Sequence, residues 1–81
     1  MEVRIRLGSG IARLAAAPVL VLELPNGATV EDLYDRLVRS NPELAPALRS
    51  ALPVVQGAHV ARGQALAHGD EVALLTPLSG G

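Results

Sequence analysis

The chain has 81 residues, a net charge of −1 and neither cysteine nor lysine, which allows one small domain. A domain of this length has little room for both a core and an enclosed substrate pocket, which argues against a self-sufficient enzyme. The absence of cysteine excludes disulfides, iron–sulfur ligation and thiol nucleophiles. The charge supplies no basic field for nucleic acid, and the only aromatic residue, Tyr34, leaves no base-stacking platform.

The first elements are predicted to be two paired strands. Strict alternation of apolar and charged residues predicts a half-buried strand over Glu2–Leu7. The Gly-Ser-Gly run that follows is typical of an ordinary turn, and the alanine-rich stretch over 11–18 predicts a loop with at most one helical turn. Val19–Leu24 is predicted to form a second strand, antiparallel to the first.

The segment after residue 28 is the strongest helix prediction. Thr29 is a good N-cap with Asp32 three residues on, as in a capping box. Apolar residues then recur at helical spacing and form one stripe, at Val30, Leu33, Tyr34, Leu37 and Val38. The helix is expected to end at Asn41, because the residue before a proline avoids the α region.

The last third of the chain is predicted to return to strands. Leucines recurring every fourth residue predict a short helix or 3₁₀ turn over 42–52. A short strand is expected over Val54–Gly57 and a further one, with ambiguous bounds, over 60–66. Glu71–Thr76 is predicted to be a strand buried on both faces, and Pro77 ends it.

This order of elements predicts a two-layer α+β domain over 1–77, with a flexible tail over 78–81. The sheet should be mixed, with about four or five strands and one main amphipathic helix across one face. The first and last strands should pair in parallel in its interior. No apolar run reaches the roughly 20 residues that span a bilayer, so we expect a cytoplasmic protein.

The C-terminus is the most informative segment for function. Gly80 and Gly81 have no Cβ and form a thin thread that ends in a carboxylate. From Pro77 to Gly81 an extended tail reaches roughly 15 Å, so the carboxylate can enter a channel too narrow for ordinary side chains. A carboxylate is unreactive until it becomes a better acyl group, such as an acyl-adenylate made from ATP.

The other candidate groups favour ordinary structural roles. His59 and His68 have no third ligand at suitable spacing for a metal. Asp70 and Glu71 are adjacent on an expected strand, so their side chains point to opposite faces and make a poor acid–base pair. Tyr34 is expected in the core with its hydroxyl at the rim. These residues therefore offer no plausible catalytic set.

Three segments carry a family resemblance. LPNGATVEDL, from Leu24 to Leu33, and HGDEVALLTPLSGG, from His68 to Gly81, resemble the MoaD-type β-grasp proteins, a family of ubiquitin-like sulfur carriers. The segment from Gly8 to Leu14 is similar to the first loop of that family. Thr76 and Leu78 stand where that family often has proline and valine. The resemblance implies a β-grasp (ubiquitin-like) fold for the domain.

The resemblance also implies a function, as the small subunit of molybdopterin synthase in molybdenum cofactor biosynthesis. An E1-like adenylyltransferase of the MoeB/ThiF type would use ATP and Mg²⁺ to adenylate Gly81, and a sulfurtransferase would supply the sulfur of a C-terminal thiocarboxylate. The tail would then enter a MoaE-like large subunit, in a heterotetramer, and donate sulfur to a pterin precursor. The tail residues expected to insert are Gly80, Ser79, Leu78 and Pro77. The carrier is expected to bind no cofactor or metal and to be inactive alone.

Three alternatives stay open. A ThiS-like carrier for thiamin, tRNA thiolation or cysteine synthesis would share the Gly-Gly end, and so would a ubiquitin-like modifier of lysines on other proteins. A plain interaction domain would make no use of the glycines. The mean hydropathy of +0.33 is high for so small a domain and predicts an exposed apolar surface that partners cover.

Overall fold

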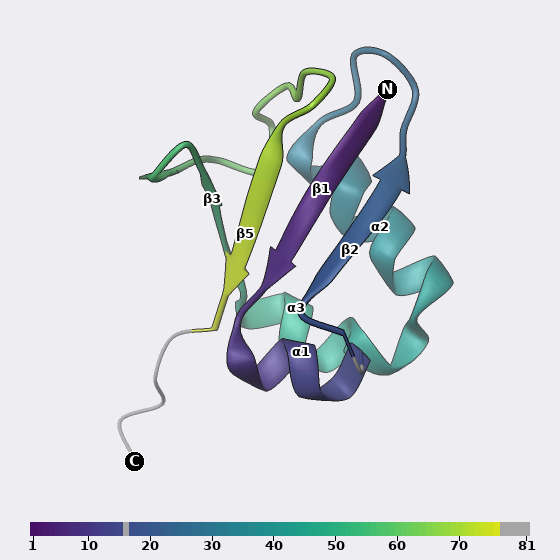
Figure 1. Ribbon diagram of the computed structural model, residues 1–81, viewed down its shortest axis with the longest axis vertical. Coiled ribbons are helices and arrows are strands. Elements are labelled where there is room, and N and C mark those ends of the chain that lie inside the picture. Colours follow the sequence, from purple (N-terminus) through teal and green to yellow (C-terminus); the bar gives the residue numbers. More distant parts are fainter. Residues whose placement is uncertain (16, 77–81) are drawn as a thin grey trace.

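The computed structural model describes residues 1–15 and 17–76 (Figure 1). The predictions for Pro77, Leu78, Ser79, Gly80 and Gly81 therefore fall outside the described residues. The elements in chain order are β1 (Glu2–Leu7), α1 (Ser9–Ala15), β2 (Val19–Glu23), α2 (Val30–Ser40), the 3₁₀ helix η1 (Pro42–Leu44), α3 (Ala45–Ser50), β3 (Leu52–Val55), β4 (Ala58–His59) and β5 (Glu71–Leu75).

One five-stranded mixed sheet organises the domain, in the order β2-β1-β5-β3-β4. β1 and β5 pair in parallel, whereas β1 with β2, β3 with β5 and β3 with β4 are antiparallel. α2 lies across one face of the sheet, and α1 and α3 lie at the end where β1 and β5 terminate (Figure 1). This is the predicted β-grasp fold, with the two terminal strands side by side in the interior.

The core lies between the sheet and α2. Alternate residues of β1 and β5 point into it, and Leu33 and Leu37 of α2 meet them with no exposed surface. Full burial of one such side chain is worth about 1.5–3 kcal/mol. The strand residues of this core are Val3, Ile5, Leu7, Val72 and Leu74.

The predicted capping box at the start of α2 is confirmed. The Thr29 hydroxyl accepts a hydrogen bond from the Asp32 backbone N–H at 3.3 Å, and the Asp32 carboxylate accepts one from the Thr29 N–H at 2.9 Å. At the other end, the Asn41 N–H donates to the Leu37 carbonyl and Pro42 follows. Local sequence signals alone therefore set both ends of this helix.

The loop predicted over 11–18 was wrong, because residues 9–15 form the helix α1. Gly8 does not break the chain there; its carbonyl accepts the Ala12 N–H at 2.8 Å and begins the helix. Ile11 is fully buried and anchors α1 under the sheet. Packing of this one side chain outweighs the weak helix preference of the glycines.

The strands near residue 55 also differ from prediction. β3 starts at Leu52 and includes Pro53, and the short strand expected over 60–66 is instead β4 at Ala58–His59. The two strands are joined by Gln56 and Gly57, whose φ angles of 52° and 78° are both positive, as a two-residue type I′ hairpin requires.

The expectation that the last strand is buried on both faces was wrong as well. Val72 and Leu74 are buried, but Glu71 and Leu75 are exposed and Ala73 is half-buried. The helices in the described part of the chain cover only one face of the sheet, the face on which Val72 and Leu74 are buried (Figure 1). The face that carries Glu71 and Leu75 has no covering helix among the described residues. None of those helices is long and apolar enough to cross a membrane.

Candidate functional site

The first part of the candidate site is the root of the tail, where the chain leaves β5. β5 is the middle strand, and its end lies beside the start of α1 (Figure 1). The Gly8 N–H donates to the Leu74 carbonyl at 2.9 Å, and a Cβ on residue 8 would lie 3.2 Å from that oxygen. A Cβ on Gly10 would lie 3.7 Å from the Thr76 hydroxyl. Gly8 is therefore more than part of the predicted turn, since its missing Cβ permits the close approach to the Leu74 carbonyl, whereas a Cβ at Gly10 would make only an ordinary contact.

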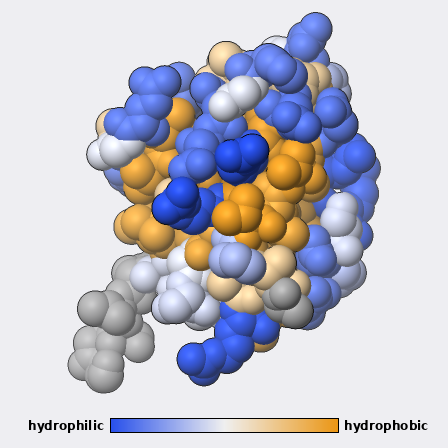
Figure 2. Space-filling view, viewed as in Figure 1, coloured by the Kyte–Doolittle hydropathy of each residue, from blue (hydrophilic) through white to orange (hydrophobic). Residues whose placement is uncertain are grey.

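The second part is the open face, the sheet surface turned away from the helices. It carries four exposed apolar side chains, 40–53% accessible, which are Val19, Val21, Leu52 and Leu75. Figure 2 views this face and shows apolar surface gathered over the half of the sheet nearer the C-terminal end of β5, with hydrophilic side chains among it. The expectation of exposed apolar surface is thus confirmed.

Two arginines interrupt the apolar surface of the open face. In the β1–β2 register Arg4 lies opposite Val21, and Arg6 lies opposite Val19. Arg6 Nε is 3.5 Å from the Glu71 carboxylate, but the two side chains are 64% and 45% exposed, so the pair adds little stability. Arginine stems cover apolar surface while their heads stay in water. The face is therefore suited to a partner surface that is apolar with polar groups among it.

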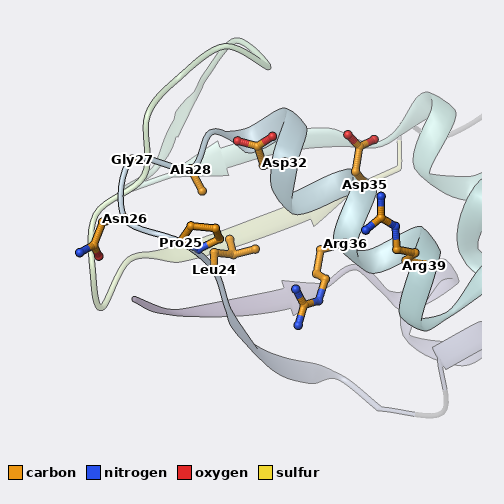
Figure 3. Close-up of a pocket in the computed structure, with 9 residues that line it drawn as sticks. All are labelled: Leu24, Pro25, Asn26, Gly27, Ala28, Asp32, Asp35, Arg36 and Arg39. Atoms are coloured by element: carbon orange, nitrogen blue, oxygen red, sulfur yellow. The ribbon is translucent and has the colours of Figure 1, made fainter.

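A groove of about 350 Å³ lies on the other side of the domain, between the β2–α2 loop and α2 (Figure 3). Its charged residues, Asp32, Asp35, Arg36 and Arg39, all come from α2 and are exposed. The Asp32 carboxylate already accepts the Thr29 N–H of the capping box. The groove is therefore an open surface feature lined by exposed charges, and not an enclosed pocket.

Tyr34 has a structural role. Its hydroxyl is buried and donates to the Ala51 carbonyl at 2.9 Å, deeper than the rim position expected. The Arg62 guanidinium lies 4.0 Å from its ring centroid. Burial raises the pKa of the Tyr34 phenol above its ordinary value of 10.0, and the nearby Arg62 charge opposes that rise. Tyr34 thus connects α2 to the end of α3 and to the loop over 60–70, which we call the 60s loop.

The two histidines lie apart from one another. His59 is exposed on β4, and His68 Nδ1 accepts the Glu2 N–H at 3.0 Å. In the described ranges no three His, Cys, Asp or Glu side chains come together in a way that would hold a metal. The candidate functional site therefore consists of the root of the tail and the adjoining open face.

A model of the ThiS family matches residues 10–81, which include α2, β5 and the Gly-Gly end. The chain belongs to the ThiS family. Two curated relatives are molybdopterin synthase sulfur carrier subunits. The one from Arabidopsis thaliana is 27% identical, over all of this chain and 84% of its own. The one from Chlamydomonas reinhardtii is 29% identical over the whole of both chains.

Solved structures similar to this ThiS-family chain agree with its fold. The crystal structure of SAMP1, a small archaeal modifier protein from Haloferax volcanii, matches with a TM-score of 0.90 and 29% identity over the whole of both chains. A complex of subunits 1 and 2 of molybdopterin-converting factor from Helicobacter pylori contains a chain that matches with a TM-score of 0.73 and 18% identity, again over the whole of both. The proteins to which this chain is similar thus include both sulfur carrier subunits and a modifier.

Proposed function

We propose that this chain is a sulfur carrier, the small subunit of a molybdopterin synthase. An E1-like enzyme would adenylate the Gly81 carboxylate with ATP and Mg²⁺, and sulfur would replace one carboxylate oxygen. The resulting thiocarboxylate would pass to a MoaE-like large subunit and convert a pterin precursor. The observation that carries the proposal is the match of the ThiS family model to 10–81, the Gly-Gly end included.

The names of the curated relatives support the molybdopterin branch of this family. Both span this whole chain, and both are sulfur carrier subunits of molybdopterin synthase. The described residues are consistent with a carrier, because they contain no buried charged side chain that would serve as a catalytic acid or base. The chemistry would therefore lie in partner active sites, and this chain would supply the acyl group.

The geometry supports delivery of that group to a partner. The root of the tail, at Thr76, follows Leu75 at the apolar end of the open face. A tail of five residues reaches about 15 Å from that root. A partner docked on the open face would thus bring its active site within reach of Gly81. A MoaE-like partner is in keeping with the Helicobacter pylori complex of subunits 1 and 2.

The decisive experiment is the intact mass after incubation with candidate E1-like enzymes, ATP, Mg²⁺ and a sulfur donor. We expect a gain equal to replacing one oxygen by sulfur, absent when Gly81 is deleted. The charged carrier should then yield molybdopterin with a large subunit and the pterin precursor. Failure to gain sulfur with any of these enzymes would contradict sulfur carriage itself. A thiocarboxylate that no large subunit accepts would contradict only the molybdopterin assignment.

The open face gives a second test with a matched control. Val21→Asp places a charge in the apolar part of the face, whereas Asn26→Asp adds the same charge in the exposed β2–α2 loop. We expect the first change to weaken binding of the large subunit and the second to leave it unchanged, with both proteins folded by circular dichroism. Equal affinities for the two variants would place the docking surface elsewhere.

A protein modifier is the second candidate, and the similarity to the Haloferax volcanii modifier favours it. The same activated Gly81 would then form isopeptide bonds with lysines of target proteins. An epitope-tagged chain expressed in its own host would produce higher-mass conjugates that resist reduction and disappear on deletion of Gly81. If the tagged chain is found only in its unconjugated form, the result would support the carrier function alone.

A further inference from the structure

The side chains of this protein offer an activated acyl group no strong nucleophile. The chain contains neither lysine nor cysteine, and all seven of its basic side chains are arginine. A guanidinium stays protonated in proteins and has no lone pair to donate. An acyl group on Gly81 of one copy therefore finds no amine or thiol side chain on another.

Among the residues of this sequence the remaining amine is the Met1 nitrogen, and the fold engages it in a hydrogen bond. The ammonium donates to the Leu24 carbonyl at 2.6 Å, and the Leu24 N–H donates back to the Met1 carbonyl at 2.8 Å. The Glu23 carboxylate lies 3.7 Å away, and Met1 as a whole is partly buried. This pair extends the β1–β2 ladder by one residue. The amine must give up its hydrogen bond to the Leu24 carbonyl before its nitrogen can attack.

The hydroxyl groups are poor acceptors as well. The Tyr34 hydroxyl is buried and bonded to the Ala51 carbonyl, and the Thr29 hydroxyl takes part in the capping box. An alcohol becomes a useful nucleophile when a base takes its proton. In the described part of the chain, the hydrogen bonds join no serine to a histidine or a carboxylate.

We propose that the chain is built to be inert toward its own activated carboxyl group, so that every acceptor lies on another molecule. The inference rests on the proposed function, since it concerns the fate of the Gly81 acyl-adenylate. Self-acylation would form a bond from the Gly81 carbonyl carbon to an amine nitrogen, break the bond to AMP and release a proton to solvent. The residues of this sequence offer no lysine or cysteine, and the Met1 nitrogen is held in the β1–β2 ladder, so this step is slow and the acyl group persists until an external sulfur donor or protein amine takes it.

The first test measures the Met1 amine directly and needs no partner enzyme. An N-hydroxysuccinimide acetyl ester is added to the folded chain and to the chain unfolded in urea, and acetylation is followed by mass. We expect the folded chain to be acetylated about tenfold more slowly, because the amine must first break its hydrogen bond to the Leu24 carbonyl. A Gly-Gly-Ser extension before Met1 should remove this protection. Equal rates in folded and unfolded chains would overturn the inference.

The second test uses the activating enzyme with ATP and Mg²⁺ but no sulfur donor, at high carrier concentration. The wild type should form no covalent dimer. Arg49→Lys adds an amine at an exposed position without changing charge, and this variant should form dimers joined at residue 49. Wild-type dimers joined at Met1 would overturn the inference, and so would an Arg49→Lys variant that stays monomeric. Failure of the enzyme to adenylate any variant would contradict the proposed function instead, while the acetylation result stands independently.

Discussion

Arg62 is the residue at which one substitution should cost the most stability for an exposed side chain. Its guanidinium lies 4.0 Å from the Tyr34 ring centroid, donates to the Leu48 carbonyl at 3.3 Å and pairs with the Glu31 carboxylate at 3.5 Å. The side chain thus connects the 60s loop to α2 and α3. Arg62→Ala removes all three contacts at once.

The expected loss is about 2 kcal/mol. The stacked cation is worth about 0.5–1 kcal/mol at a partly exposed site. The Leu48 carbonyl is part-buried, and loss of its hydrogen bond costs about 1 kcal/mol. The pair with Glu31 is 41% and 51% exposed, so it adds at most a few tenths. Arg62→Lys should recover only a small part of the lost free energy of unfolding, because an ammonium cannot stack flat on the Tyr34 ring or donate hydrogen bonds in the planar arrangement of a guanidinium.

Urea unfolding followed by circular dichroism measures this loss. With an m-value of about 1 kcal/mol/M, the midpoint should fall by about 2 M for Arg62→Ala at unchanged m. Arg49→Ala is the matched control, since Arg49 is exposed and enters no salt bridge within the described residues. A midpoint for Arg62→Ala that lies as close to wild type as the Arg49 control would refute the reasoning.

Four further outcomes are expected. Burial raises the pKa of Tyr34, the only tyrosine. The contribution of its neutral phenol to the free energy of unfolding is therefore fully present below pH 10 and is lost as pH rises through the folded pKa. Ultraviolet titration should show that the phenol ionises at higher pH in the folded protein than in the urea-unfolded protein. Gln56→Gly relieves a positive φ and should add about 0.5–1 kcal/mol in urea melts. Gly8→Ala crowds the Leu74 carbonyl and should lower the thermal midpoint. Val21→Ser should raise KM for the activating enzyme about fivefold, worth about 1 kcal/mol of apolar contact, with kcat unchanged.

The parts of the fold that local signals specify were predictable from the sequence. The strand pattern of β1 and the caps of α2 depend on residues close together in the chain, and both are as predicted. α1 depends on a distant contact, because Ile11 is buried under the sheet while Gly8 and Gly10 at its start disfavour a helix. The spacing of residues in the sequence does not reveal that Ile11 packs under the sheet, so a loop was predicted.

The prediction for β5 failed for a different physical reason. An apolar run such as Val72–Leu75 fits a strand covered on both sides, and the sequence does not say which covering elements exist. In the described residues the second covering layer is absent, and Leu75 is 44% exposed. The same apolar residues then serve as surface. The strand was predictable, but the open face it belongs to required the arrangement of the other strands.

The candidate site divides in the same way. The tail was evident from sequence, because two glycines before a free carboxylate suggest a thread, while its residues Pro77–Gly81 lie outside the described ranges. The root was missed, because the closeness of Gly8 to the Leu74 carbonyl exists only once β1 and β5 are paired. A Gly-x-Gly run after a terminal strand was the available signal, and it is common in turns.

The position of the root explains why such a small chain can act through its partners. β5 is held by a parallel ladder to β1 and an antiparallel ladder to β3, so the body that docks and the strand that carries the tail move as one unit. In the proposed complex with the open face bound, a tail of about 15 Å would confine its carboxylate near the partner's active site at an effective concentration of about millimolar or above. Docking then supplies affinity and the glycines supply access, so the two properties can change independently. That separation would let one β-grasp body serve either of the two proposed functions, with the partner determining which acceptor receives the acyl group.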